Sequence, residues 1–154
     1  MSVPRHVAWA CIYGRLGVQV RQSGLSFGGA WAIAEWGARQ CDTAMGAPPG
    51  SSDQGARWNY AATTRTMPGA WDYNTSAHVK NYPDFATGIT AMVETLKLSF
   101  YKELVDALGT ANVKLQTYGE LLAASPWGTG DGIFAAIDTF TANPDLYYAL
   151  DFGP

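Results

Sequence analysis

The spacing of apolar residues predicts a mainly helical chain. The clearest case is the segment 86–108, where apolar side chains recur every three or four positions and would form a single buried stripe: Ile89, Met92, Val93, Leu96, Phe100, Tyr101, Leu104, Val105 and Leu108. Asp84 or Thr87 is placed to cap the start of this helix, and Gly109 to end it. Shorter periodic runs predict further helices at 112–123 and 131–140, and a weaker pattern favours a helix at 7–20.

A different composition marks the segment 26–40, which is rich in small and aromatic residues and suits a buried helix. Ser26 is its expected N-cap, with Leu25 before it as a hydrophobic staple. Turn-forming residues crowd the segment 42–58, which predicts a long surface loop. Aromatic residues alternate with Asn and Thr through 58–83, and this pattern favours short strands or ordered loops.

The length and composition fit one domain spanning residues 1–154, with a mainly α fold and a small β or loop region. The net charge is -3 and no run of Lys or Arg occurs, so a nucleic acid is not an expected partner. The apolar segment after Arg5 is interrupted by Gly14, Arg15 and Gly17. It therefore predicts neither a signal peptide nor insertion in a membrane.

Two cysteines and two histidines offer little for metal or redox chemistry. Cys11 and Cys41 are too few for a disulfide framework and are expected to be buried thiols, although one bond between them is left open. His6 and His78 occur without a CxxC motif, so the sequence predicts no zinc site. We expect no metal and no cofactor.

Glu35 is the most informative single residue, because it lies between Trp31 and Trp36 among small apolar side chains. Such surroundings solvate a carboxylate poorly, and the pKa of the carboxyl group should rise. A carboxyl group that keeps its proton near neutral pH can protonate a glycosidic oxygen. The alternative interpretation is that Glu35 turns to water from the polar side of an amphipathic helix.

An ordered set of short motifs resembles the lysozyme-like domain of bacteriophage cell-wall hydrolases and virion proteins, especially those of phages that infect actinobacteria. The matching pieces cover about two-thirds of the chain in the same order: Trp31 with Glu35 and Gly37, 58–64, Pro68-Gly69, Tyr73-Asn74, 79–85, 88–91, Thr95-Leu96 and 124–130. Three departures occur. Trp36 stands where small residues are commoner, and Tyr60 and Ala62 replace the Pro and the second Asn of the family's Asn-Pro-Leu-Asn-Thr-Thr stretch.

The resemblance implies a compact helical fold of the lysozyme-like α+β type, with a loop-lined cleft that binds the glycan of peptidoglycan and with Glu35 as the general acid. Cleavage of a β-1,4 bond then follows from protonation of the leaving oxygen. Asp42, Asp53 and Asp72 lie in loops that should line the cleft, and Asp72 is the preferred second catalytic carboxylate. A scheme with a single catalytic acid is also open. In it, a polar residue positions water, or the substrate's own acetamido group or hydroxyl is the nucleophile. The hydroxyl route would make the protein a lytic transglycosylase.

Six residues are predicted to bind substrate from their places in the matching motifs: Asn59, Thr64, Tyr73, Asn74, Tyr82 and Trp127. Aromatic rings stack on sugar faces, while Asn and Thr pair with hydroxyl and acetamido groups. Structural roles are equally open for some of them. Trp127 after Ser125-Pro126 could plug the core, and Tyr82 could simply pack beside Pro83.

Two other classes of protein compete with the glycosidase hypothesis. A serine or cysteine hydrolase is disfavoured, because no Gly-x-Ser-x-Gly motif occurs. A phage virion or tail protein that keeps the fold without catalysis is the serious alternative. The first hypothesis predicts peptidoglycan glycan strands as the partner, and the second predicts other virion proteins. Both fit a phage protein that is made in the host cytoplasm and then acts at the cell wall or joins the virion.

Overall fold

The computed structural model describes Val3 and residues 5–36, 57–73 and 76–143, which are mostly helical. In chain order the elements are α1 (Arg5–Arg15), α2 (Gln22–Trp36), β1 (Trp71–Asp72), β2 (Lys80–Asn81), α4 (Phe85–Leu96), the 3-10 helix η1 (Ser99–Tyr101), α5 (Lys102–Leu108), α6 (Leu115–Ala123) and α7 (Gly132–Ala142). The mainly α class predicted from the apolar spacing is confirmed. None of the helices in these ranges is both long and apolar enough to traverse a lipid bilayer.

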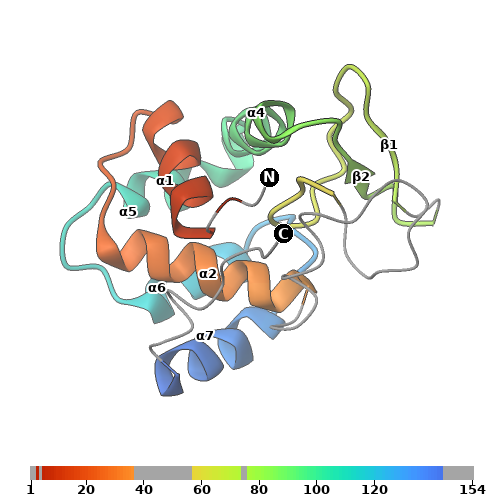
Figure 1. Ribbon diagram of the computed structural model, residues 1–154. Coiled ribbons are helices and arrows are strands. Elements are labelled where there is room, and N and C mark those ends of the chain that lie inside the picture. The colour runs from red at the N-terminus through yellow and green to blue at the C-terminus, as the bar shows by residue number, and fades with distance from the viewer. Residues whose placement is uncertain (1–2, 4, 37–56, 74–75, 144–154) are drawn as a thin grey trace.

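Helix α2 is central, and α1, α6 and α7 all pack against it. Figure 1 shows α2 between α1 on one side and α7 on the other. Most of its residues from Gly24 onward are buried, which is expected of a helix that is apolar on every face. The helix begins at Gln22, so the prediction of Ser26 as its N-cap was wrong: Ser26 lies inside the helix.

The predicted helix at 86–108 is two helices rather than one. Asp84 caps α4 by accepting a hydrogen bond from the backbone N–H of Thr87 at 2.7 Å, as expected. Helix α4 then ends at Leu96, and Leu98 is extended with φ −64° and ψ 145° before η1 begins. As a result Phe100, which the spacing placed in the buried stripe, is 65% exposed, whereas Tyr101 turns inward.

A short β-hairpin lies beside the helices and holds the segment before it. Strand β1 pairs antiparallel with β2, with Trp71 opposite Asn81 and Asp72 opposite Lys80, and this confirms the expectation of short strands in 58–83. The backbone N–H of Lys80 donates to the carbonyl of Thr63, and the backbone N–H of Tyr82 donates to the carbonyl of Arg57. The hairpin therefore fixes both ends of the segment 57–65.

The same segment lies against α4 at Gly88. A Cβ atom at Gly88 would lie 2.0 Å from the carbonyl oxygen of Trp58, so only glycine permits this approach. Trp58 and Ala62 both have positive φ angles, 55° and 56°, which side-chain-bearing residues rarely adopt. Segment 57–65 is thus held in an unusual backbone shape by the hairpin and by α4.

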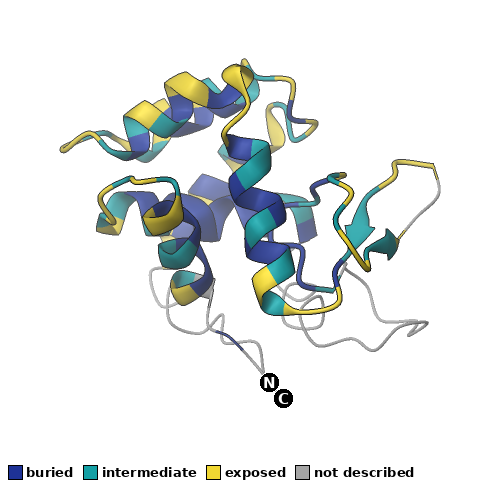
Figure 2. Cartoon of the chain, turned by 90° about the horizontal axis from the view of Figure 1, so that it is seen from above, coloured by how far each residue is buried: buried dark blue, intermediate teal, exposed yellow. Residues whose placement is uncertain are grey.

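Buried residues gather where the helices face one another, and the exposed ones lie on the outer surfaces (Figure 2). The helical spacing of Ile133, Phe134, Ile137 and Phe140 predicts a core face for α7; three of these side chains are buried, and Phe134 is half-buried. Cys11 is a half-buried free thiol. Cys41 and most of the predicted loop 42–58, namely residues 42–56, lie outside the described residues.

Candidate functional site

Glu35 lies in the last turn of α2, four residues after Trp31 and therefore on the same face of the helix. The Trp31 ring is fully buried and makes an edge contact with the ring of Trp127, with centroids 4.7 Å apart and planes at 76°. The Thr129 hydroxyl, from the segment between α6 and α7, donates a hydrogen bond to Oε1 of Glu35. The half-buried carboxyl group thus has two indoles and one hydroxyl as neighbours.

These surroundings raise the pKa of Glu35 above its ordinary value. Burial is the main cause, because the ionised form loses its contact with water. The Thr129 hydroxyl opposes this effect by stabilising the carboxylate, with smaller contributions from the indole groups of Trp127 and Trp31. The elevated pKa predicted from the apolar neighbours is confirmed in direction, and the alternative of a water-facing Glu35 loses its support.

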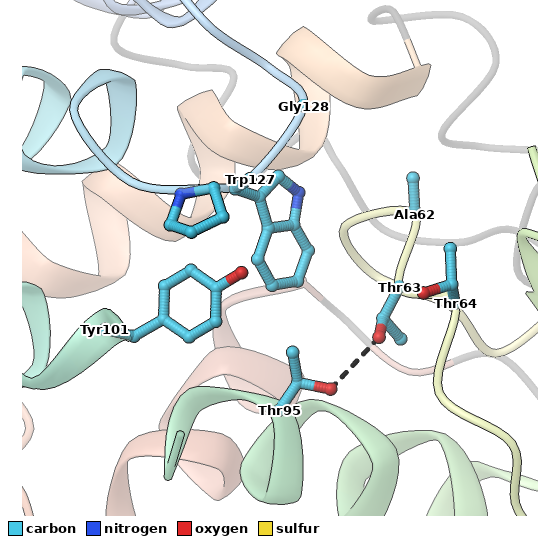
Figure 3. Close-up of a pocket in the computed structure, with 8 residues that line it drawn as sticks. Ala62, Thr63, Thr64, Thr95, Tyr101, Trp127 and Gly128 are labelled. Atoms are coloured by element: carbon cyan, nitrogen blue, oxygen red, sulfur yellow. Dashed lines mark hydrogen bonds between the residues drawn. The ribbon is translucent and has the colours of Figure 1, made fainter. Parts of the chain in front are cut away.

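A hollow of about 160 Å³ opens beside Trp127. Its lining comes from four parts of the chain: Ala62, Thr63 and Thr64 before the hairpin, Thr95 on α4, Tyr101 on η1, and Pro126, Trp127 and Gly128 after α6. Figure 3 shows Trp127 between Tyr101 and the threonines. Glu35 does not itself line the hollow, but Trp127 and Gly128 do, and they directly precede its hydrogen-bond donor Thr129.

Asn59 shapes the wall of this hollow and has no exposed surface with which to touch a ligand. Its side-chain N–H groups donate to the carbonyls of Thr63 and Lys80, both at 2.8 Å, and its side-chain oxygen accepts from the backbone N–H of Thr63 at 2.9 Å. The predicted contact between Asn59 and substrate is therefore wrong in this structure. The amide instead closes the loop 59–63 and ties it to β2.

Tyr82 is likewise a structural residue. Its ring is fully buried, and its hydroxyl donates to the carbonyl of Arg65 at 2.8 Å. Burial raises the pKa of this phenol, so the group keeps its proton. The alternative of a packing role describes Tyr82 correctly, and the predicted substrate contact does not.

Of the remaining predicted residues, some line the hollow and others do not. Thr64 and Trp127 line the hollow, as a substrate-binding role requires. Tyr73 is 37% exposed and makes an edge contact with the ring of Trp36, 5.7 Å away, which places it near the end of α2. Asn74 lies outside the described residues, as do Asp42 and Asp53.

Asp72 is exposed on β1 and forms an ion pair with Lys80 on β2. The hydrogen bond from Lys80 lowers the pKa of Asp72, so this carboxyl group is ionised at neutral pH. Asp72 is not among the residues that line the hollow, and within the described ranges no interaction joins it to Glu35. The structure does not bring the two predicted catalytic carboxylates together.

No protein-family model, curated protein or solved structure matches this chain. In the described parts of the chain, no group of three or more His, Cys, Asp or Glu side chains is arranged to hold a metal ion. The function must therefore be argued from the geometry of the site.

Three threonines of the site were not among the predicted site residues. Thr63, Thr95 and Thr129 each fall within a motif of the resemblance, yet no local feature distinguishes them from other threonines. Two of them meet only in the folded chain, where the hydroxyls of Thr63 and Thr95 are 3.1 Å apart (Figure 3). Tyr101 was predicted as core, which is correct, but its ring also lines the hollow.

Proposed function

We propose that this chain is a peptidoglycan-degrading glycosidase of the lysozyme-like type, with Glu35 as its general acid. The observation that carries the proposal is a carboxyl group with a raised pKa that interacts with two indoles and with Thr129, one of these indoles, Trp127, also lining an open hollow. A carboxyl group whose protonated form is favoured, near a hollow with an aromatic wall, suits the protonation of a glycosidic oxygen. The resemblance in the sequence names the glycan of bacterial peptidoglycan as the substrate.

The surroundings of Glu35 suit both halves of a proton transfer. Burial favours the protonated form of the carboxyl group before the reaction. When the β-1,4 bond breaks, the proton moves to the leaving oxygen, and the carboxylate that forms is stabilised by the hydroxyl of Thr129. The electron-deficient C1 of the other sugar is then captured by water in a hydrolase, or by the substrate's own hydroxyl in a lytic transglycosylase.

A non-catalytic virion or tail protein is the second candidate function. Leu98 and Phe100, on the corner between α4 and α5, are 41% and 65% exposed. Exposed apolar side chains of this size are typical of surfaces that bind other proteins. In this case the partners would be other phage virion proteins; in the first case the chain would act on glycan strands after leaving the host cytoplasm, or from the virion.

The deciding experiment compares the soluble fragments released from purified actinobacterial peptidoglycan by the wild type, Glu35→Gln and Glu120→Gln, with the products identified by mass spectrometry. Glu120 is an exposed carboxyl residue on α6 and serves as the matched control. We expect the wild type and Glu120→Gln to release fragments and Glu35→Gln to release about 100-fold fewer, the order of effect that a general acid supplies. Reducing-end products indicate hydrolysis, and anhydro-sugar products indicate a transglycosylase.

Folded wild type that releases nothing between pH 4 and pH 8 would refute the catalytic proposal and favour the virion protein. An Asp72→Asn arm decides the role of the second predicted carboxylate. Loss of activity in this variant would make Asp72 catalytic despite its ion pair with Lys80. Retained activity would favour the single-acid scheme.

A further inference from the structure

A second hollow of about 220 Å³ adjoins the first and shares three of its residues, Thr63, Thr64 and Thr95. Its other lining residues are Arg65, Thr66 and Leu98. The two hollows differ in kind. Trp127 and Tyr101 give the first one aromatic walls, which suit the face of a sugar ring, whereas no aromatic residue lines the second.

The two shared hydroxyls of Thr63 and Thr95 can accept hydrogen bonds but cannot donate them to a ligand. Thr95 donates its hydroxyl proton to the carbonyl of Ala91 at 2.8 Å, one turn back on α4. In the 3.1 Å contact between the two hydroxyls, Thr63 must then be the donor. Thr63 also accepts from the backbone N–H of Arg65 at 3.3 Å. Neither hydroxyl then has a free proton, and the Thr95 oxygen keeps one free lone pair, so a group bound there must bring its own N–H or O–H.

Arg65 supplies the opposite kind of group. Its Nε donates to Oε2 of Glu94 at 2.8 Å, and its backbone carbonyl accepts from Tyr82, so the residue is anchored at both ends. Among the described residues, Glu94 is the one acidic side chain paired with Arg65, and this pairing uses Nε. The two terminal nitrogens of the guanidinium group are available to donate to a carbonyl or carboxylate. Leu98 is 41% exposed and adds a small apolar surface.

The second hollow thus offers hydrogen-bond acceptors on Thr63 and Thr95, a donor on Arg65 and a small apolar surface on Leu98. This combination matches a peptide group better than a further sugar. We propose that the second hollow binds the peptide branch of the glycan, with an amide N–H on the Thr63–Thr95 pair, a carbonyl or carboxylate on Arg65, and a methyl group against Leu98. The inference rests on the proposed function and deepens it. The chain would then prefer peptide-bearing glycan over the bare strand.

The test compares two substrates that differ only in the branch: peptidoglycan, and the same glycan after an N-acetylmuramoyl-L-alanine amidase has removed its stem peptides. We expect the wild type to cleave the intact substrate about tenfold faster. Thr95→Val should reduce kcat/KM on the intact substrate about two- to tenfold, the range of one hydrogen bond. Because Thr95 also lines the first hollow, the stripped glycan is affected too, but less than the intact substrate. Thr95→Ser should restore the preference, because it keeps the hydroxyl.

The matched control is Thr90→Val. Thr90 lies on the same helix and makes the same bond, from its hydroxyl to the carbonyl of Ala86 at 2.8 Å, but it is not part of either hollow. This variant should keep the wild-type preference. Equal cleavage of both substrates by the wild type, or an equal loss on both in Thr95→Val, would overturn the inference while the glycosidase proposal stands.

A binding experiment keeps the inference testable if neither substrate is cleaved, the result that would refute the proposed function. Muramyl dipeptide is titrated into 15N-labelled wild type and into Arg65→Gln, with chitobiose as the branch-free probe. A peptide-branch site predicts that muramyl dipeptide shifts the backbone amide signals of Thr63, Arg65 and Leu98 and that chitobiose does not. It also predicts that Arg65→Gln binds muramyl dipeptide about tenfold more weakly. The absence of such shifts would overturn it.

Discussion

Gly88→Ala tests the contact that shapes the site. The new Cβ atom would lie 2.0 Å from the carbonyl oxygen of Trp58 and 3.0 Å from its carbonyl carbon, so segment 57–65 must retreat by about 1 Å or more. The retreat works against the hydrogen bonds that tie this segment to the hairpin. Overpacking of this kind costs about 1–3 kcal/mol.

Helix propensity acts in the opposite direction and gives the experiment its control. Alanine is better than glycine within a helix by about 0.5–1 kcal/mol. Gly14 on α1 has no atom within 4 Å of an added Cβ, so Gly14→Ala should stabilise the protein by this amount. Gly88→Ala should instead destabilise it by about 1–2 kcal/mol, which lowers Tm by about 2–8 °C in a domain of this size.

The assay is urea denaturation of the wild type and both variants, followed by circular dichroism, with kcat/KM on peptidoglycan as a second readout. Because segment 57–65 also lines the first hollow, Gly88→Ala should reduce kcat/KM more than its stability loss explains at temperatures where the variant is folded. A Gly88→Ala variant as stable as Gly14→Ala would refute the close approach of α4 to Trp58.

Three further predictions concern Glu35 and the residues that hold its site. The pKa of Glu35 is higher in the folded than in the unfolded chain. The stability that Glu35 contributes is therefore complete below the unfolded pKa and is lost as the pH rises through the folded pKa. Glu35→Gln should raise Tm at pH 7 and change it less at pH 4. Thr129→Val removes a donor to the carboxylate, so the pKa of Glu35 should rise further and the alkaline limb of the pH–activity profile should move to higher pH. Tyr82→Phe removes the bond to the carbonyl of Arg65 and should lower the free energy of unfolding by about 1 kcal/mol, measured by urea denaturation.

Local patterns predicted the helices well where the pattern and the tertiary contacts agree. Asp84 and Gly109 bound the long apolar run as expected. The break at Leu98 could not be predicted, because no proline or glycine occurs between Ile89 and Leu108 and the apolar spacing continues through this segment. The break depends on distant contacts: it turns Tyr101 toward the Trp127 ring, with centroids 5.5 Å apart, and leaves Phe100 exposed.

Site residues could likewise be predicted where their neighbours are close in sequence, and not where their partners are distant. Glu35 could be identified because its apolar neighbours are adjacent in sequence or one helical turn away. Asn59 was assigned to substrate from its place in the matching motifs, but its partner Lys80 is 21 positions away, and only the fold shows that its amide binds the backbone. The hydrogen-bond pairing of Thr63 with Thr95, across 32 positions, is likewise a property of the folded chain alone.

The hydrogen bond between Glu35 and Thr129 has a consequence for the order of synthesis. Its partners are 94 positions apart, so the acid leaves the ribosome long before the hydroxyl that holds it. Trp127, whose indole also acts on the carboxyl group, is made late as well. A nascent chain that ends before Trp127 has Glu35 without either of these partners. The surroundings that shift the pKa of Glu35 are therefore complete only after translation has passed Thr129.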